Sequence, residues 1–145
     1  MRLSYGAAVL SAVVYFVIQA AWFTVFASPW IAGLGWTPEH VEQVKSQMTM
    51  WPYVAAFVCN VVMALAVGKL MVWTGRTSAV GGAALGATAW AGLVLTSMIT
   101  EFAFERKPAA FTAIAAGAVL VGLIVMGAIQ GAWMARKGKA AAAAV

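Results

Sequence analysis

The apolar residues of this 145-residue chain are gathered into four long intervals that contain no charged side chain. These intervals cover residues 3–38, 46–68, 77–100 and 108–135. A helix needs about 20 apolar residues to cross a bilayer, so each interval has room for one crossing and none has comfortable room for two. The intervals do not alternate between apolar and polar residues, as the strands of a membrane barrel do. The pattern therefore predicts an all-α integral membrane protein built as a four-helix bundle.

The predicted spans leave one long connection on the outer side of the membrane, between the first and the second span. The spans cover about residues 5–26, 52–73, 79–102 and 108–133 of a single membrane domain, residues 1–145. In the outer loop, residues 27–51, the sequence Thr37-Pro38-Glu39 offers a hydroxyl for a helix N-cap, then proline and an acid for the first turn. We therefore expect a short amphipathic helix from about residue 38, lying along the membrane interface.

The charged residues differ in sign between the two sides of the predicted membrane. Four crossings place both termini and the middle connection on one side, which holds six basic residues and no acid: Arg2, Lys69, Arg76, Arg136, Lys137 and Lys139. The other side holds all four acids, Glu39, Glu42, Glu101 and Glu105, together with Lys45, Arg106 and Lys107. Lys and Arg are enriched in cytoplasmic loops, so we expect a multi-pass protein of the cell inner membrane with both termini cytoplasmic.

The net charge of +5 is then explained by membrane topology. The basic residues of the chain do not interleave with exposed aromatic residues, so the sequence does not favour a nucleic-acid partner. The partner that it does predict is the lipid bilayer. Aromatic and basic side chains that we expect at the membrane interfaces are Trp22, Trp30, Trp51, Trp73, Phe104, Arg106 and Trp133.

Small residues recur at four-residue spacing in the third and fourth spans. Gly82 and Gly86 form one pair, and Gly127 and Gly131 form the other. Both pairs lie near the cytoplasmic end, because the two helices run in opposite directions. Glycine lets helix backbones approach closely in membranes, so the spacing favours contact between these two spans. The alternative is that the same surfaces contact another copy of the protein.

Polar residues in the outer half of the predicted bilayer form the candidate binding site. They are Gln19, Asn60, Thr96, Ser97, Thr100 and Glu101. Polar groups in lipid are costly unless they find partners in the protein or reach water. We expect these residues to converge, either to take a small ligand or to tie helices together. Glu101 has a simpler alternative, which is a headgroup-level ion pair with Arg106 or Lys107.

The sequence offers little for catalysis. It contains no set of serine, histidine and acid, no metal quartet and no glycine-rich phosphate loop. His40 has no second histidine or nearby cysteine at ligand spacing, and Cys59 has no cysteine partner. We therefore expect no catalytic residue, no metal and no cofactor.

The chain resembles, over most of its length, the small bacterial membrane proteins of the domain-of-unknown-function family numbered 1761. The matching residues are Trp22-Phe23, Trp30, Trp90, Thr100-Glu101-Phe102, Phe104 to Pro108, Gly117, Gly127, Gly131 and Trp133. The chain differs at Glu101, where asparagine is usual, and at Ala118, where an aromatic residue is usual. The resemblance implies a four-helix membrane protein without an established activity, so it supplies no catalytic residue.

Packing surfaces outnumber reactive groups in this sequence. The leading functional hypothesis is therefore a non-enzymatic helix-packing module that associates with itself, as a homo-oligomer, or with a larger membrane protein complex. The alternative is a small-solute or ion carrier that uses the outer polar residues. The third hypothesis is an enzyme that acts on lipid.

Overall fold

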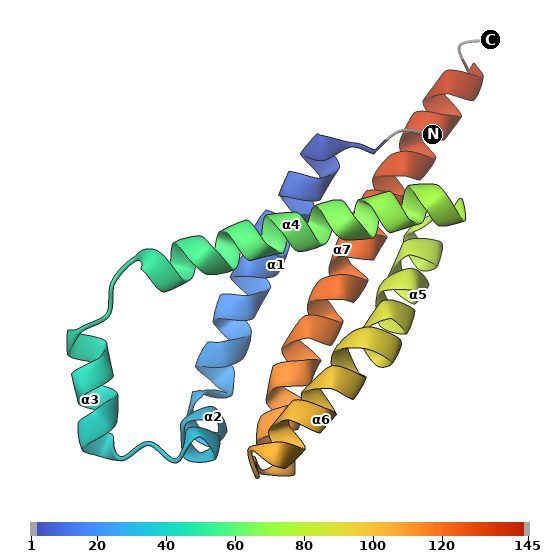
Figure 1. Ribbon diagram of the computed structural model, residues 1–145. Coiled ribbons are helices and arrows are strands. Elements are labelled where there is room, and N and C mark those ends of the chain that lie inside the picture. Colours follow the sequence, from blue (N-terminus) through green and yellow to red (C-terminus); the bar gives the residue numbers. More distant parts are fainter. Residues whose placement is uncertain (1–2, 144–145) are drawn as a thin grey trace.

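The computed structural model describes residues 3–143, and every regular element in that range is a helix (Figure 1). The elements in order are α1 (Tyr5–Val25), α2 (Ala27–Leu34), α3 (Pro38–Ser46), α4 (Trp51–Thr74), α5 (Ala79–Ala89), the π-helical segment η1 (Trp90–Leu95), α6 (Thr96–Phe104) and α7 (Ala109–Ala143). Within the described range, four helices are long and apolar enough to cross a membrane: α1, α4, the continuous run from α5 to α6, and α7. The predicted all-α class and the four apolar helices are confirmed. Arg2 lies outside the described residues.

Two helical segments extend beyond the predicted boundaries. α7 continues to Ala143, ten residues past the predicted end of the fourth span, because alanine, lysine and arginine are strong helix formers. α2 was not predicted, and it begins directly after Phe26, the residue that ends α1. α2 ends at Gly35, whose φ of +72° is in the left-handed region that glycine adopts without strain.

The connection between the first two long helices contains α3, which begins at the predicted residue. The Thr37 hydroxyl oxygen accepts a hydrogen bond from the His40 backbone N–H at 3.3 Å, and Pro38 occupies the first turn. The Glu39 carboxylate accepts a hydrogen bond from its own backbone amide, and together with the Thr37 hydroxyl this holds the pKa of Glu39 below its ordinary value. The start of α3 is thus capped in the way that its sequence predicts.

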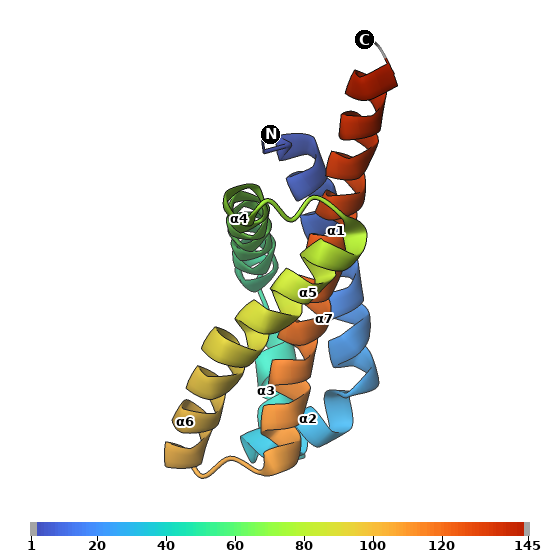
Figure 2. The same cartoon turned by 90° about the vertical axis from the view of Figure 1, so that its right-hand side faces the viewer.

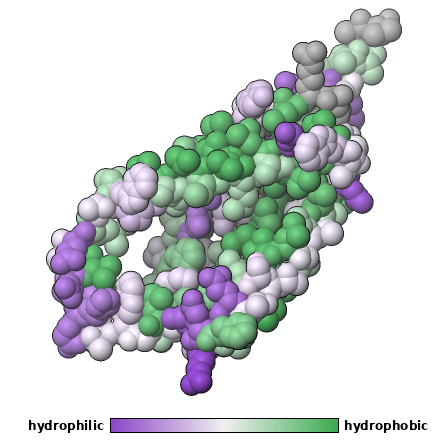
Figure 3. All heavy atoms as spheres, viewed as in Figure 1, coloured by the Kyte–Doolittle hydropathy of each residue, from purple (hydrophilic) through white to green (hydrophobic). Residues whose placement is uncertain are grey.

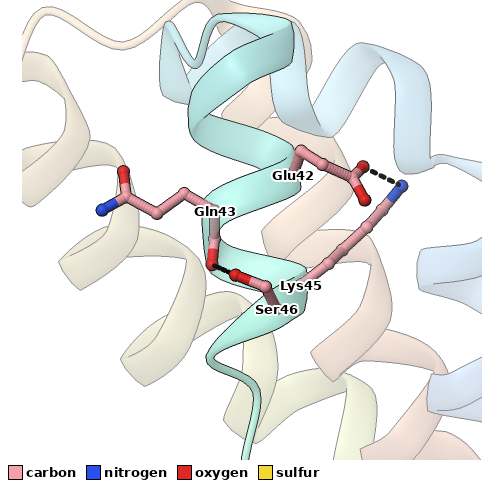
Figure 4. A network of polar contacts seen from close by, with 4 residues as sticks. All are labelled: Glu42, Gln43, Lys45 and Ser46. Atoms are coloured by element: carbon pink, nitrogen blue, oxygen red, sulfur yellow. Dashed lines mark hydrogen bonds and ion pairs between the residues drawn. The ribbon is translucent and has the colours of Figure 1, made fainter.

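Val41 and Val44 of α3 are half-buried, and the polar side chains between and after them are exposed. Figure 4 shows the contacts that four of these polar residues make. The Lys45 ammonium lies 3.7 Å from a Glu42 carboxylate oxygen, and the Ser46 hydroxyl donates to the Gln43 carbonyl at 2.8 Å. An exposed pair at this helical spacing contributes only about 0.3–0.5 kcal/mol, so it supports the helix without fixing its position.

The tightest helix contact in the structure joins α5 to α7. A Cβ added to Gly82 would meet the carbonyl oxygen of Gly127, and a Cβ added to Gly127 would meet that of Gly82. A Cβ on Gly86 would meet the Leu123 carbonyl oxygen, and one on Gly131 would meet that of Ser78. The two backbones are therefore in direct contact, which is the arrangement that the glycine spacing predicted.

The helix α4 departs from a side-by-side bundle. Figures 1 and 2, which view the molecule from two perpendicular directions, show α4 crossing α1 and α7 at a steep angle. All buried residues of α4 lie between positions 60 and 71: Asn60, Ala64, Val67, Gly68 and Met71. Its first nine residues, 51–59, contain no buried side chain. α4 is therefore packed into the bundle from Asn60 onward, whereas residues 51–59 lie away from the core.

The buried core lies where α4 crosses the other helices. Ala8 and Ala12 of α1, Ala64 of α4 and Met126 of α7 are fully buried there. Small side chains on α1 and α4 let the two helices cross at short distance. The Met71 side chain lies beside Gly82, so α4 also contacts the α5–α7 seam.

We expect Gly82→Ala to destabilise the protein, because the new Cβ has no room against the Gly127 backbone. Overpacking of this kind costs about 1–3 kcal/mol. Gly92→Ala is the matched control, since a Cβ there meets nothing within 4 Å. Alanine is the better helix former, so the control should be neutral or stabilising. Unfolding of the purified protein in a graded detergent mixture measures both changes, and equal behaviour of the two variants would contradict the close contact.

Candidate functional site

A groove opens along the C-terminal half of α1, where α4 moves away from it (Figure 3). The groove has a volume of about 790 Å³. Its lining residues come from α1, α2, α3, α4 and the α3–α4 connection: Phe16, Gln19, Ala20, Phe23, Thr24, Ala27, Lys45, Met48, Pro52, Tyr53 and Ala56. We call it the α1–α4 groove.

One wall of the α1–α4 groove is a helical stripe. Phe16, Ala20 and Phe23 follow each other on α1 at spacings of four and three residues, which places them on one side of that helix, and Ala27 continues the wall as the first residue of α2. At one end of the stripe, the Phe16 ring meets the Phe57 ring of α4 edge to face, with centroids 5.7 Å apart. At the other end, the Phe23 ring meets the Trp30 ring of α2, with centroids 5.0 Å apart. Between these contacts, Ala20 is exposed in the groove. This is the kind of surface on which helices normally pack.

Two of the predicted polar residues meet in this region. The Asn60 side-chain nitrogen donates a hydrogen bond to the Gln19 side-chain oxygen at 3.0 Å. Asn60 is buried, whereas Gln19 is half-buried and lines the groove. In the described part of the chain, no hydrogen bond from the Gln19 amide nitrogen is found. That nitrogen is therefore a donor that the groove offers to an occupant.

The predicted hydroxyl residues do not join this pair. Thr96 and Thr100 are exposed, and each hydroxyl donates to a carbonyl four residues earlier in its own helix, at 2.9 and 3.0 Å. Ser97 does the same at 2.7 Å. α6 contacts neither α1 nor α4: α7 lies between α6 and α1, and α4 crosses the molecule near the end opposite to α6 (Figures 1 and 2). The expected convergence of all the outer polar residues is thus corrected to a single amide pair.

Glu101 also stands apart from the groove. Its side chain is exposed, and Glu42–Lys45 is the one ion pair among residues 3–143. The expected pair between Glu101 and Arg106 or Lys107 is therefore absent there. The Lys107 ammonium lies instead over the Phe111 ring, 5.2 Å from its centroid.

Three tryptophans hold the N-terminal half of α7. The Trp22 indole N–H donates to the Ile114 carbonyl at 3.1 Å, and the Trp90 indole N–H donates to the Ala116 carbonyl at 2.7 Å. The Trp30 ring stacks on Phe111 with centroids 4.2 Å apart. Trp22 and Trp30, which we expect at the membrane interface, are thus half-buried against α7. We call these three residues the tryptophan collar.

The other expected interface residues do point outward. Trp51, Trp73 and Phe104 are 72%, 70% and 87% exposed, and Trp133 is 37% exposed. Arg106 is also exposed, in the turn before α7, with a φ of +55°. Exposure at helix ends is compatible with the interfacial position that aromatic residues favour.

One almost fully buried polar side chain was not among the predicted site residues. Gln130 of α7 is 1% exposed and donates to the Ala64 carbonyl at 2.9 Å and to the Ser11 hydroxyl at 3.4 Å. It ties α7 to both α4 and α1. The sequence signal was its place between Gly127 and Gly131, on a surface already expected to be buried.

We expect Gln19→Leu and Asn60→Leu to be coupled, because each removes one side of the same hydrogen bond. Such bonds in membrane proteins contribute about 0.6 kcal/mol on average and up to about 1.7 kcal/mol. A double-mutant cycle on unfolding free energies measures the coupling. Thr96→Val, which breaks a bond only within its own helix, should show no coupling to Asn60→Leu. Additive effects of Gln19→Leu and Asn60→Leu would contradict the pairing.

Comparison with known proteins identifies a family for this chain. The family model described as Protein of unknown function (DUF1761) matches residues 7–131, which confirms the resemblance. No curated protein and no solved structure matches the chain. The matched region includes the tryptophan collar, the amide pair and both glycine pairs. Since the match covers most of its length, the chain belongs to the DUF1761 family of proteins of unknown function.

Proposed function

We propose that this protein is a non-enzymatic membrane module that completes its helix packing with a second copy of itself, directly or as part of a larger membrane complex. The observation that carries the proposal is the apolar stripe of α1 that lines the α1–α4 groove, residues Phe16, Ala20 and Phe23. Helix-in-groove docking uses apolar anchors at this spacing. The small side chain of Ala20, which is exposed in the groove, allows a partner helix to come close.

The glycine pairs are already in contact within one chain, which favours the groove as the surface for association. Gly82, Gly86, Gly127 and Gly131 are occupied by contacts between α5 and α7 within one chain. They leave no glycine surface of this set free for a partner. The Gln19 amide in the groove, by contrast, still has a donor to offer, and polar groups of this kind join helices in membranes.

The proposal includes an orientation in the cell inner membrane, with both termini cytoplasmic. The start of α1, the end of α7 and the α4–α5 connection lie at one end of the molecule, away from the connections that carry the acids (Figure 1). Lys69, Arg76 and Lys137 are exposed at that end. The bias of Lys and Arg toward cytoplasmic loops supports this orientation.

Carriage of a small solute or ion is the second candidate function. It is favoured by the volume of the α1–α4 groove, about 790 Å³, which is within the range of roughly 300–1,000 Å³ typical of ligand pockets. The groove has Gln19 in its wall, but Thr96, Thr100 and Glu101 lie outside it. A carrier would therefore rely on the amide pair rather than on the whole set of outer polar residues.

Ala20→Trp tests the self-association. The indole would fill the middle of the groove, so we expect association of the variant in mild detergent to weaken at least about tenfold, which corresponds to about 1.4 kcal/mol. Val17→Trp is the matched control, because Val17 is 63% exposed on α1 and does not line the groove. Sedimentation, or light scattering coupled to size-exclusion chromatography, gives the molecular mass of both variants across a dilution series.

A wild-type protein that is monomeric at every concentration, or equal weakening by both substitutions, would contradict the proposal. A carrier gives a different pattern in proteoliposomes. In that case Ala20→Trp and Asn60→Leu both stop a flux that Val17→Trp leaves intact, while the molecular mass is the same for all variants.

A further inference from the structure

Two pockets lie side by side at the end of the molecule where α1 begins and where α4 and α7 end. The first, of about 300 Å³, is lined by residues of the α7 end, among them Trp133 and Lys137. The second, of about 490 Å³, is lined by residues of the α4 end, among them Lys69 and Trp73. Leu3 lines both pockets and forms their common wall.

The two pockets have the same chemistry although they are built by different helices. Each has one lysine and one tryptophan, and the rest of its lining is mostly apolar. The Lys69 ammonium lies 5.1 Å from the centroid of the Trp73 ring, which holds the cation beside its pocket. A cation at the edge of an apolar wall suits a ligand that is anionic at one end and apolar at the other.

The charge at this end of the molecule is not neutralised. All four acidic residues, at positions 39, 42, 101 and 105, lie in or next to the connections at the opposite end. Lys69 and Lys137 make no ion pair within residues 3–143, whereas Lys45 does, with Glu42. The two lysines are therefore available to an external anion.

We propose that each pocket binds the headgroup of an anionic phospholipid, with Lys69 or Lys137 against the phosphate. Trp73 and Trp133 then lie at the level of the glycerol, where tryptophan is favoured, and the apolar lining contacts the upper acyl chains. Basic pockets between membrane helices bind lipid phosphates in this way. The two pockets lie on a different surface from the α1–α4 groove, and lipid binding there does not depend on self-association.

The apolar lining favours a lipid over free phosphate. A soluble phosphate ion offers nothing to the walls formed by Leu3, Leu65 and Val72, and each pocket supplies only one cation to hold it. A phospholipid adds burial of apolar surface to the same charge contact. The headgroup and the chain are thus recognised together.

Native mass spectrometry of the full chain in mild detergent tests the assignment. The protein is incubated with equal amounts of phosphatidylglycerol, which is anionic, and phosphatidylcholine, which has no net charge. We expect wild-type protein to retain phosphatidylglycerol preferentially. A surface lysine contributes about a fivefold preference, so Lys69→Gln and Lys137→Gln should each lower it by about that factor, and the double variant by more.

Lys139→Gln is the matched control, because Lys139 is exposed, two residues after Lys137, and lines neither pocket. It should leave the preference unchanged. Equal retention of both lipids by wild-type protein, or an equal loss with Lys139→Gln, would overturn the proposal in favour of no selectivity or of diffuse surface charge. Displacement of the lipid by millimolar inorganic phosphate would show that the anion, and not the lipid, is what binds.

Discussion

Direct backbone contact between α5 and α7 is the constraint on which the remaining arrangement depends. Helices in lipid gain nothing from hiding apolar surface from one another, so they associate by close packing and by hydrogen bonds. Gly82 and Gly127 provide the closest packing in the molecule. Met71 of α4 lies at this seam, and Gln130 of α7 bonds to α1 and α4 one turn further along. The end of the protein where α5 begins is therefore held by glycine contacts and one buried amide.

The other end of the molecule follows from the angle at which α4 crosses this unit. The tryptophan collar keeps α1, α2 and η1 on α7, but the first nine residues of α4 contain no buried side chain. The α1–α4 groove is the space that results. This groove leaves room for the partner helix that we propose, and the lysines at the basic end are placed for the proposed contact with lipid phosphate.

The helices could be predicted closely from the sequence, but their arrangement could not. The spans predicted within the charge-free intervals start within one residue of each long helix, and the glycine spacing predicted the α5–α7 contact. The angle at which α4 crosses could not be predicted, because apolar residues surround the whole of α4 and mark no single face for packing. The outer polar residues failed to converge because threonine and serine hydroxyls bond to their own helix. Asn60, Gln19 and Gln130, whose amides bond across helices, were the residues that did find partners.

The distance between the Gly82 and Gly127 backbones in a lipid bilayer tests this arrangement most directly. Magic-angle-spinning NMR on protein with ¹³C-labelled glycine, reconstituted in vesicles, reports it without any substitution. The structure predicts a strong correlation between the Gly82 α-carbon and the Gly127 carbonyl carbon, because each glycine lies where a Cβ would touch the other's carbonyl oxygen. Absence of that correlation, in a sample whose Trp22 indole still shows its contact with Gly117, would contradict the backbone contact from which the fold is built.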